Sequence, residues 1–311
     1  MAERLYLADS YLTRFEADVV AERAVDGHPA VTLSRTAFYP EGGGQPADRG
    51  TLGGAAVIDV RDVDGEVLHL LGGPAPQGRV AGEVDWPRRF DHMQQHHGQH
   101  LLSAAFERLL GARTVSFHLG EEVCTIDLDV AATRLGPGTL REVEAACNAT
   151  VWADLPVAAR DLAPEELARL PLRREPSRGS RVVIVGELRA KGQPDEAGPS
   201  NASASPPPVR RAEPASSERS GGVVDASPCG GTHPRRTGEV GCVAVLRAQK
   251  WAAGARVEFQ CGGRVVRALA GSQERLARVA GALRCAPLEA PEAAARVADE
   301  SARLRREAER L

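Results

Sequence analysis

The 311-residue sequence lacks the features of a membrane protein and of a protein that coats nucleic acid. Its apolar runs are far shorter than the roughly 18 residues that a membrane-spanning helix needs, and no signal-type apolar core follows Met1. The formal net charge of −3 excludes the strongly basic chain that binds nucleic acid by bulk electrostatics, although a local basic patch remains possible. We therefore expect a soluble, cytoplasmic protein without membrane contacts.

Lysine is also scarce, and the cysteines do not follow a disulfide pattern. Of 39 basic residues only Lys191 and Lys250 are lysines, a bias typical of a GC-rich genome rather than of a functional choice. The six cysteines are widely spread in a long chain without a secretory signal, so disulfides are not expected. Most of them are expected to be buried small hydrophobes, which leaves room for one metal ligand. They are Cys124, Cys147, Cys229, Cys242, Cys261 and Cys285.

The texture of the sequence changes along the chain and predicts three parts. Residues 1–87 contain short alternating or apolar runs between Gly, Pro and Asp clusters, which predicts a small β-rich domain. Residues 88–265 mix predicted helices and strands, and residues 266–311 are expected to form a helical tail. The low-complexity stretch 192–222 is predicted to be a flexible insertion in the second part, because its composition cannot bury enough apolar area to order it.

Within these parts the periodicity places individual elements. Apolar and histidine residues recur at steps of three and four from Asp91 until Gly111, which predicts a helix. A strand pair is expected over 114–129, a second helix over 138–153, and strands near Val157 and over 181–185. In the tail, Leu276, Val279 and Leu283 share one helix face, and a seven-residue spacing of Val297, Leu304 and Leu311 indicates a coiled-coil or hairpin seam.

Histidines cluster in the first predicted helix, where four of the eight lie within nine residues: His92, His96, His97 and His100. His96 and His100 stand four apart, so their imidazoles leave one helix face about one turn apart and could grip one ion. Helix packing or surface histidines are the alternative interpretation.

A second candidate pair lies in Cys229-Gly230-Gly231-Thr232-His233, where the glycines suit a tight turn that presents Cys229 and His233 to one point. Together the two pairs supply one sulfur and three nitrogens, a set suited to tetrahedral zinc, although the turn could also lie beside a merely buried cysteine. The pairs are too far apart for a zinc finger. A zinc peptidase is disfavoured because His97 stands where that class carries a glutamate.

Three motifs give the sequence a resemblance to a known family. The runs FYPEGGGQPADRG, MQQHHGQHLLSAAF and CGGTHPRRTGEVG, in this order, resemble the AlaX-type alanyl-tRNA editing proteins, which are related to the editing domain of alanyl-tRNA synthetase. The segments at 84–89, 116–120 and 256–259 add to the resemblance, which covers about residues 1–265. It implies an α+β fold in which a small N-terminal β-barrel precedes an α/β zinc-binding editing domain.

The resemblance also implies an activity and a site. The family hydrolyses the ester that joins a wrong amino acid, chiefly serine, to the tRNA specific for alanine. Its single zinc ion would be held by His96, His100, Cys229 and His233. Its glycine-rich motif falls on Gly42, Gly43 and Gly44, followed by Gln45, beside the editing cleft. These four residues are expected to contact the substrate, together with Arg235 and Arg236. His97 departs from the small hydroxyl residue that is usual in the family. Longer members continue through a coiled coil into a C-terminal domain, whose tRNA contacts are expected to be absent here or to have been removed.

The remaining candidate site residues lie on the predicted strand pair and beside the motifs. A pocket that hydrogen-bonds the serine hydroxyl could reject alanine, because its polar group would otherwise stay unpaired. Its candidates are Thr114, Ser116, His118 and Thr125. Candidate phosphate contacts are Arg88, Arg89, Arg235, Arg236 and Lys250, each of which could equally be a solvated charge. No carboxylate is indicated as a general base, since Glu239 could cap a turn or pair with a neighbouring arginine.

Several alternatives stay open at this point. Four protein ligands leave a tetrahedral zinc no free position, so a ligand could yield to substrate, the shell could expand, or zinc could only hold the site together. The chain could also be a non-catalytic tRNA- or protein-binding module with a structural zinc, or act mainly on glycine attached to the same tRNA. The predicted C-terminal helix could join two copies of the chain.

Overall fold

The structure is a computed structural model that describes residues 2–174, 181–187 and 222–310. The predicted low-complexity insertion at 192–222 lies outside the described residues except for Gly222. The chain divides into two compact units, Met1–Gly262 and Gly263–Leu311. Over the described residues, no helix is both long enough and apolar enough to cross a membrane.

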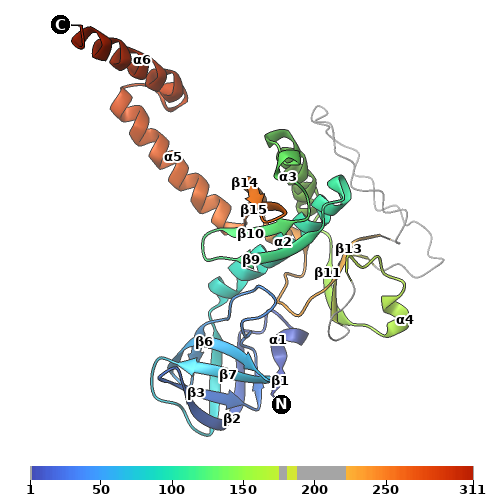
Figure 1. The fold of residues 1–311 in the computed structure, drawn as a ribbon. Coiled ribbons are helices and arrows are strands. Elements are labelled where there is room, and N and C mark those ends of the chain that lie inside the picture. The colour runs from blue at the N-terminus through green and yellow to red at the C-terminus, as the bar shows by residue number, and fades with distance from the viewer. Residues whose placement is uncertain (1, 175–180, 188–221, 311) are drawn as a thin grey trace, which may run out of the picture. The chain divides into compact units, whose positions relative to one another are not determined.

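The first unit contains six antiparallel strands that close into a barrel in the order β2-β3-β7-β6-β5-β8 (Figure 1). Alternating side chains fill its interior, among them Phe15, Val31 and Leu52. Asp26-Gly27 and Asp64-Gly65 form two-residue hairpin turns with positive φ, as an Asp-Gly pair favours. The strands are β2 (Arg14–Val25), β3 (His28–Leu33), β5 (Gly50–Leu52), β6 (Ala55–Val63), β7 (Glu66–Leu71) and β8 (Arg79–Val84). A short helix α1 (Leu5–Ala8) and the parallel pair β1 (Glu3–Arg4) and β4 (Arg35–Thr36) accompany them.

A buried histidine in the barrel gives it a predictable response to acid. His69 on β7 is fully buried; its Nδ1 lies 3.1 Å from the carbonyl of Val31 and its Nε2 lies 2.8 Å from Thr36 Oγ1. The carbonyl can only accept, so Nδ1 carries the proton and Nε2 accepts from the hydroxyl. Burial lowers the pKa of His69 from 6.5 to about 4.

We expect the free energy of unfolding to fall by up to about 1.4 kcal/mol per pH unit through this histidine as the pH drops from 6.5 to about 4. In that window the unfolded chain binds the proton that the folded barrel excludes, so this contribution is complete above pH 6.5. Denaturant unfolding of the wild type and of His69→Gln across pH 4–7 measures it as the difference between the two curves. Parallel curves over the whole window would contradict the prediction.

A buried ion pair attaches the barrel to the long helix α2 (Trp86–Leu110). Arg89 on this helix is fully buried and donates to Asp48 through Nε at 2.9 Å and through Nη2, and also to the carbonyls of Ser10 and Ala37. Asp48 also accepts from the backbone N–H of Tyr39 at 2.6 Å. The prediction that Arg89 is a candidate phosphate contact is therefore wrong, because its guanidinium is buried and used inside the fold. Its neighbour Arg88 donates to the carbonyl of Ala47 at 3.1 Å.

The helix α2 is the predicted histidine helix, and its ends have identifiable causes. The Asp85 side chain caps its first turn, Pro87 occupies a first-turn position, and Gly111 ends it in the left-handed region at φ 64°. It packs against α3 (Pro137–Trp152) and the antiparallel sheet β14-β15-β10-β9. Their shared core includes Leu102, Phe106 and Phe259. The sheet comprises β9 (Thr114–Leu119), β10 (Cys124–Leu128), β14 (Val243–Trp251) and β15 (Gly254–Cys261).

A second, three-stranded sheet leads into the cysteine motif. It consists of β11 (Val157–Asp161), β12 (Arg181–Gly186) and β13 (Val223–Pro228), all antiparallel neighbours. Since β12 and β13 pair directly, the low-complexity segment between them interrupts one sheet rather than separating two domains. Shorter elements are α4 (Pro164–Leu167) and the 3₁₀ turns Ala132–Arg134 and Thr237–Val240.

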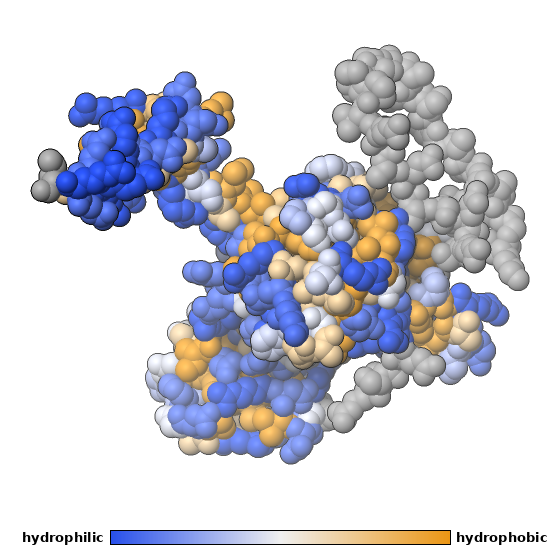
Figure 2. Space-filling model, turned by 45° about the horizontal axis from the view of Figure 1, so that its top comes forward, coloured by the Kyte–Doolittle hydropathy of each residue, from blue (hydrophilic) through white to orange (hydrophobic). Residues whose placement is uncertain are grey.

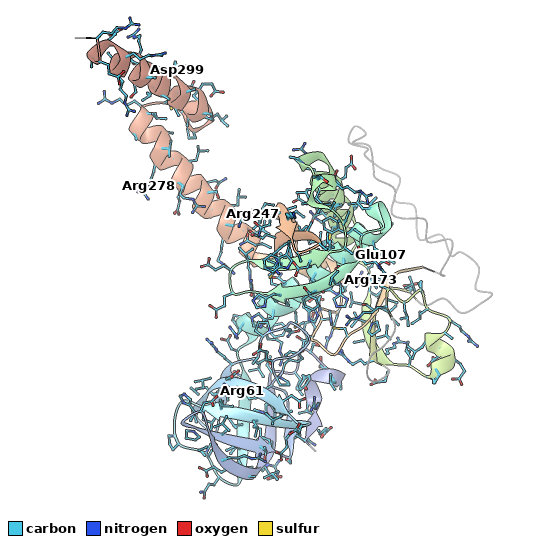
Figure 3. The ribbon with its side chains drawn as sticks, viewed as in Figure 1. Arg61, Glu107, Arg173, Arg247, Arg278 and Asp299 are labelled. Atoms are coloured by element: carbon cyan, nitrogen blue, oxygen red, sulfur yellow. The ribbon has the colours of Figure 1, made fainter. Side chains whose placement is uncertain are left out.

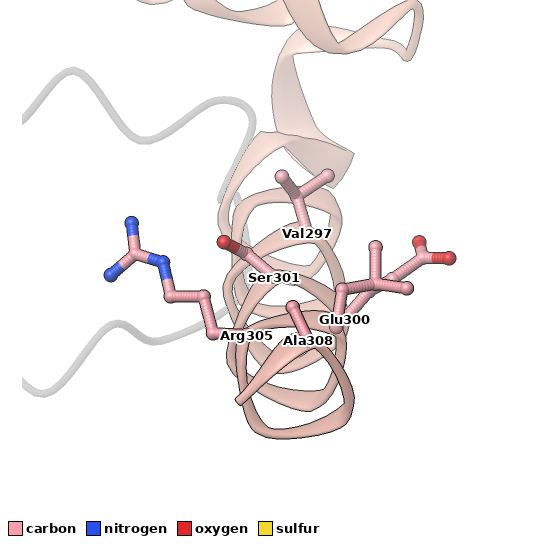
Figure 4. Close-up of a pocket in the computed structure, with 6 residues that line it drawn as sticks. Val297, Glu300, Ser301, Arg305 and Ala308 are labelled. Atoms are coloured by element: carbon pink, nitrogen blue, oxygen red, sulfur yellow. The ribbon is translucent and has the colours of Figure 1, made fainter. Parts of the chain in front are cut away.

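The second unit consists of α5 (Gly263–Leu283), a 3₁₀ turn (Pro287–Glu289) and α6 (Ala290–Ala308), in agreement with the predicted helical tail. The part of α6 visible in Figure 2 is mainly hydrophilic. Val297 and Leu304, the described members of the predicted seam, are 55% and 52% exposed. With Ser301 and Ala308 they line one shallow face of α6 (Figure 4).

Candidate metal centre and editing cavity

Four side chains from two distant segments converge in the first unit. His96 and His100 project from α2, and Cys229 and His233 project from the turn that follows β13. One ligand atom from each lies within 4.8 Å of the other three. Cys229 Sγ is 3.4 Å from His96 Nε2 and 3.3 Å from His233 Nε2. The two predicted ligand pairs therefore meet at one point, and the group can hold a metal ion.

The turn that carries Cys229 and His233 can approach α2 only because it contains glycine. A Cβ atom on Gly231 would lie 2.2 Å from His96 Cε1, far inside contact distance. Arg181 at the start of β12 stabilises the same turn by donating to the carbonyls of Cys229 and Gly231 at 2.7 and 3.0 Å. The role of this arginine could not be predicted from the sequence, because nothing in its local pattern indicates that it reaches a turn nearly fifty residues away.

Burial prepares these groups to bind a cation. Burial, with smaller contributions from Arg181 and His92, lowers the pKa of His96 to about 3, and the pKa values of His100 and His233 are well below the ordinary range for the same main reason. The imidazoles are therefore neutral near pH 7. Burial raises the pKa of the Cys229 thiol, so a metal ion that binds the thiolate must displace its proton.

The donor set fits zinc in both chemistry and spacing. Thiolate and imidazole suit a borderline ion better than cations that prefer oxygen. In a tetrahedral zinc site, bonds of about 2.0–2.3 Å place neighbouring nitrogen and sulfur ligands about 3.5 Å apart. The two measured S···N distances, 3.3 and 3.4 Å, are close to this spacing.

Each candidate ligand histidine meets a different polar group on its outer side. His96 Nδ1 lies 2.8 Å from Gln45 Oε1, and His233 Nδ1 lies 3.2 Å from His97 Nδ1. His100 Nδ1 lies 3.4 Å from Arg173 Nη2 and 3.9 Å from the buried carboxylate of Asp225. His97, which departs from the family pattern, thus contacts a ligand and does not belong to the four-ligand group.

A cavity of about 880 Å³ opens beside the four ligands, a size typical of small-molecule sites. His96, His100 and Cys229 line one part of it, and Gly43 and Thr114–Phe117 line another. Arg113, Arg173, Arg174 and Arg181 contribute positive charge. Figure 3 marks Arg173, which also forms an ion pair with Asp225 at 2.5 Å. Arg113, Arg173 and Arg174 are lining residues that the motifs did not indicate.

The glycine-rich loop reaches this cavity from the barrel. Gly43 lines it, and Gly44 has a φ of 79° and packs so closely on Phe117 that a Cβ would lie 2.5 Å from the ring. Gly42 closes the loop by exchanging backbone hydrogen bonds with Gln45 at 3.0 and 3.1 Å. Gln45, predicted with these glycines to contact substrate, is fully buried and faces His96.

The four serine-pocket candidates lie on the paired strands β9 and β10 in different surroundings. Thr114 and Ser116 line the cavity, whereas His118 and Thr125 are not among its lining residues. Ser116 donates to Asp127 at 2.5 Å, and Thr114 Oγ1 lies 2.6 Å from Ser103 Oγ. Gln99, which also lines the cavity, donates to Ser103 at 2.7 Å.

The exposed basic candidates lie elsewhere. Arg235 pairs with Asp9 at 3.1 Å and Arg236 pairs with Asp154 at 2.6 Å, and neither lines the cavity. Glu239 accepts from the backbone N–H groups of both arginines at 3.1 Å and so caps the turn. Lys250 is exposed on β14.

Among the residues that the structure describes, two carboxylates line the cavity, and neither is placed as a general base at the ligand group. Glu107, marked in Figure 3, is eleven residues beyond His96 on the same helix, a separation of about 16 Å along its axis. Asp129 accepts from Arg113 at 2.9 Å. Asp225 lies closer to the histidines but is tied to Arg173.

The four side chains form a mixed histidine and cysteine group that can hold a metal ion. Comparison with known proteins shows what the chain is similar to. It is 32% identical over 86% of its length to alanyl-tRNA editing protein AlaX-L from Pyrococcus horikoshii, covering 59% of that protein. It is 33% identical to alanyl-tRNA editing protein Aarsd1 from Danio rerio, over 71% of the chain and 46% of that protein. An alanine–tRNA ligase from Pyrobaculum neutrophilum is 36% identical over 89% of the chain and 28% of the ligase. No family model matches the chain.

The chain is therefore similar to alanyl-tRNA editing proteins and to alanine–tRNA ligases over part of the length of each, which confirms the resemblance indicated by the motifs. It spans about half the length of the editing proteins that it matches.

Proposed function

We propose that the chain is a zinc-dependent deacylase that hydrolyses the ester of alanine-specific tRNA mischarged with serine. The observation that carries the proposal is the convergence of His96, His100, Cys229 and His233 on a single point beside a cavity with four arginines. The similarity to proteins named for alanyl-tRNA editing supports the choice of substrate.

The four ligands would hold zinc, which when bound supplies Lewis-acid chemistry to an ester that is already activated. The work of the protein is to position that ester. Cavity arginines can contact phosphates or the terminal ribose of the tRNA, with Arg113 and Arg174 the most exposed of them. Arg235 and Arg236 remain proposed contacts for more distant phosphates, because both are on the surface.

Thr114 is the strongest candidate for recognising the serine hydroxyl. Ser103 accepts a hydrogen bond from Gln99. If the Ser103 hydroxyl in turn donates to Thr114 Oγ1, the three side chains form a chain of hydrogen bonds that runs in one direction, from Gln99 to Thr114. The proton of the Thr114 hydroxyl is then available to an acceptor in the cavity. Ser116 already donates to Asp127. His118 and Thr125 do not line the cavity, so Thr114 is preferred over both.

We expect Thr114→Val to reduce the deacylation of seryl-tRNA by about tenfold or more, roughly the value of one hydrogen bond. Valine has nearly the same shape as threonine but no hydroxyl, so the substitution removes the hydrogen-bond donor and preserves the shape of the cavity. Single-turnover deacylation rates measure the effect. Thr125→Val is the matched control, because it makes the same change on the neighbouring strand outside the cavity. Equal rates for Thr114→Val and the wild type would remove Thr114 from the proposal.

The function itself is tested by incubating the zinc-loaded protein with alanine-specific tRNA charged with serine, glycine or alanine. We expect seryl-tRNA to be hydrolysed fastest and alanyl-tRNA to remain largely intact. Faster hydrolysis of glycyl-tRNA would reassign the main substrate. If all three esters survive while the protein still binds the tRNA, the chain is a binding module with a structural zinc.

A further inference from the structure

The barrel contributes a side chain to the metal centre through Gln45. This glutamine is fully buried at the end of the glycine-rich loop. Its Oε1 lies 2.8 Å from His96 Nδ1 and 3.1 Å from the backbone nitrogen of Thr232, and its Nε2 lies 2.8 Å from Thr232 Oγ1. One amide group therefore contacts both segments that carry the metal ligands.

The backbone contact fixes which way the Gln45 amide points. The N–H of Thr232 can only donate, so the atom that faces it must be the oxygen. The same oxygen faces His96, and for this reason His96 Nδ1 must donate to it and carry the proton. The other ring nitrogen of His96, Nε2, then has a free lone pair and faces Cys229 Sγ at 3.4 Å.

We infer that Gln45 is a positioning residue of the metal centre. It selects the Nδ1–H tautomer of His96, aims Nε2 at the ion, and holds the Thr232 turn between Cys229 and His233. The inference rests on the metal site of the proposed function. It gives the glycine-rich loop a role other than substrate contact, because the loop delivers an outer hydrogen-bond partner to a metal ligand.

The second contact point of the amide explains why a glutamine suits this place. Both polar atoms of its amide bind Thr232. Nε2 donates to the Thr232 hydroxyl, and Oε1 accepts from the Thr232 backbone N–H. The turn is therefore gripped at its backbone and its side chain together. Gly231 precedes Thr232 and lies against His96, so a displaced turn would move both Cys229 and the imidazole.

The test compares metal binding by Gln45→Met, Gln45→Glu and the wild type. Methionine has a similar length and no amide, so zinc affinity measured against a chromophoric chelator should fall by about 10–100-fold, as for other outer-shell partners. The d–d absorption of the cobalt-substituted protein should also change, because His96 is no longer held. Glutamate keeps an acceptor for His96 and Thr232 and should retain most of the affinity.

A second buried glutamine provides the matched control. Gln95, next to His96 on α2, is fully buried and also uses both amide atoms, at 2.8 and 3.0 Å from the backbone of Cys261, outside the four-ligand group. Gln95→Met should therefore lower stability while leaving zinc affinity and the cobalt spectrum unchanged. If Gln45→Met fails to fold, Gln45→Asn replaces it, because its shorter side chain withdraws the amide from His96.

The inference would be overturned if Gln45→Met kept the zinc affinity and the cobalt absorption of the wild type. The same holds for Gln45→Asn if that variant is used in place of Gln45→Met. An equal loss of affinity in Gln95→Met would do the same. The outcome is separate from that of the proposed function. A protein whose zinc affinity depends on Gln45 but which leaves every charged tRNA intact would refute the function alone. If seryl-tRNA is hydrolysed equally fast without metal, Gln45 has no role in the hydrolysis through the metal centre.

Discussion

Replacing Cys229 with alanine should release the metal ion and stop the deacylation of seryl-tRNA. The change removes the only sulfur of the four-ligand group and leaves three neutral imidazoles. A direct ligand should matter at least as much as an outer partner, whose loss costs about 10–100-fold, so we expect zinc affinity and activity to fall by more than about 100-fold. Metal analysis of the purified protein and single-turnover deacylation measure the two effects.

Cys242→Ala is the matched control for this change. Cys242 is also partly buried in the first unit and has a free thiol, but it lies outside the ligand group. It should keep one zinc per chain and the wild-type rate. Full activity in a metal-free Cys229→Ala protein would contradict a zinc-dependent reaction. Retained zinc with lost activity would instead assign Cys229 a role other than metal binding.

The sequence predicted the elements that depend on local patterns. The helix around the histidines follows from three- and four-residue spacing and ends at Gly111 as expected, and the strand pair over 114–129 is confirmed as β9 and β10. The mixed α/β class and the convergence of the two ligand pairs are likewise confirmed. These features could be predicted because residue spacing within a helix or a turn fixes side-chain direction without knowledge of the rest of the fold.

What the sequence did not predict depends on contacts between distant segments. Arg89 looks like its neighbour Arg88 in the sequence, yet it is buried because Asp48 lies opposite it in the folded barrel. Likewise, Gln45 and Arg181 are assigned only when the loop and strand that carry them are seen against the Cys229 turn. The sequence is equally unable to show which polar side chains of a strand line a cavity. The two-residue alternation of a strand divides its side chains between two faces of the sheet, but it does not identify the face that borders the cavity.

Removing the carboxylate of Asp48 should cause the largest loss of stability among the changes considered. Asp48→Ala leaves the guanidinium of Arg89 buried and without its counter-charge, and it also removes the acceptor for the N–H of Tyr39. Breaking a buried ion pair from one side costs about 3–5 kcal/mol, a large fraction of the roughly 5–15 kcal/mol that stabilises a typical protein. Denaturant unfolding of the first unit measures the loss.

Two further variants identify the cause of that loss. Glu83→Gln breaks the ion pair with Arg14, in which the side chains of Arg14 and Glu83 are 79% and 55% exposed. It should lower the free energy of unfolding by less than about 1 kcal/mol. The double variant Asp48→Ala/Arg89→Met removes both charges, so it should be more stable than Asp48→Ala alone, although the carbonyls of Ser10 and Ala37 then lose their donor. If the double variant is less stable than the single one, the stranded charge is not the cause. The stability would then come mainly from the bonds that Arg89 donates to the backbone, which still attach α2 to the barrel when Asp48 is absent.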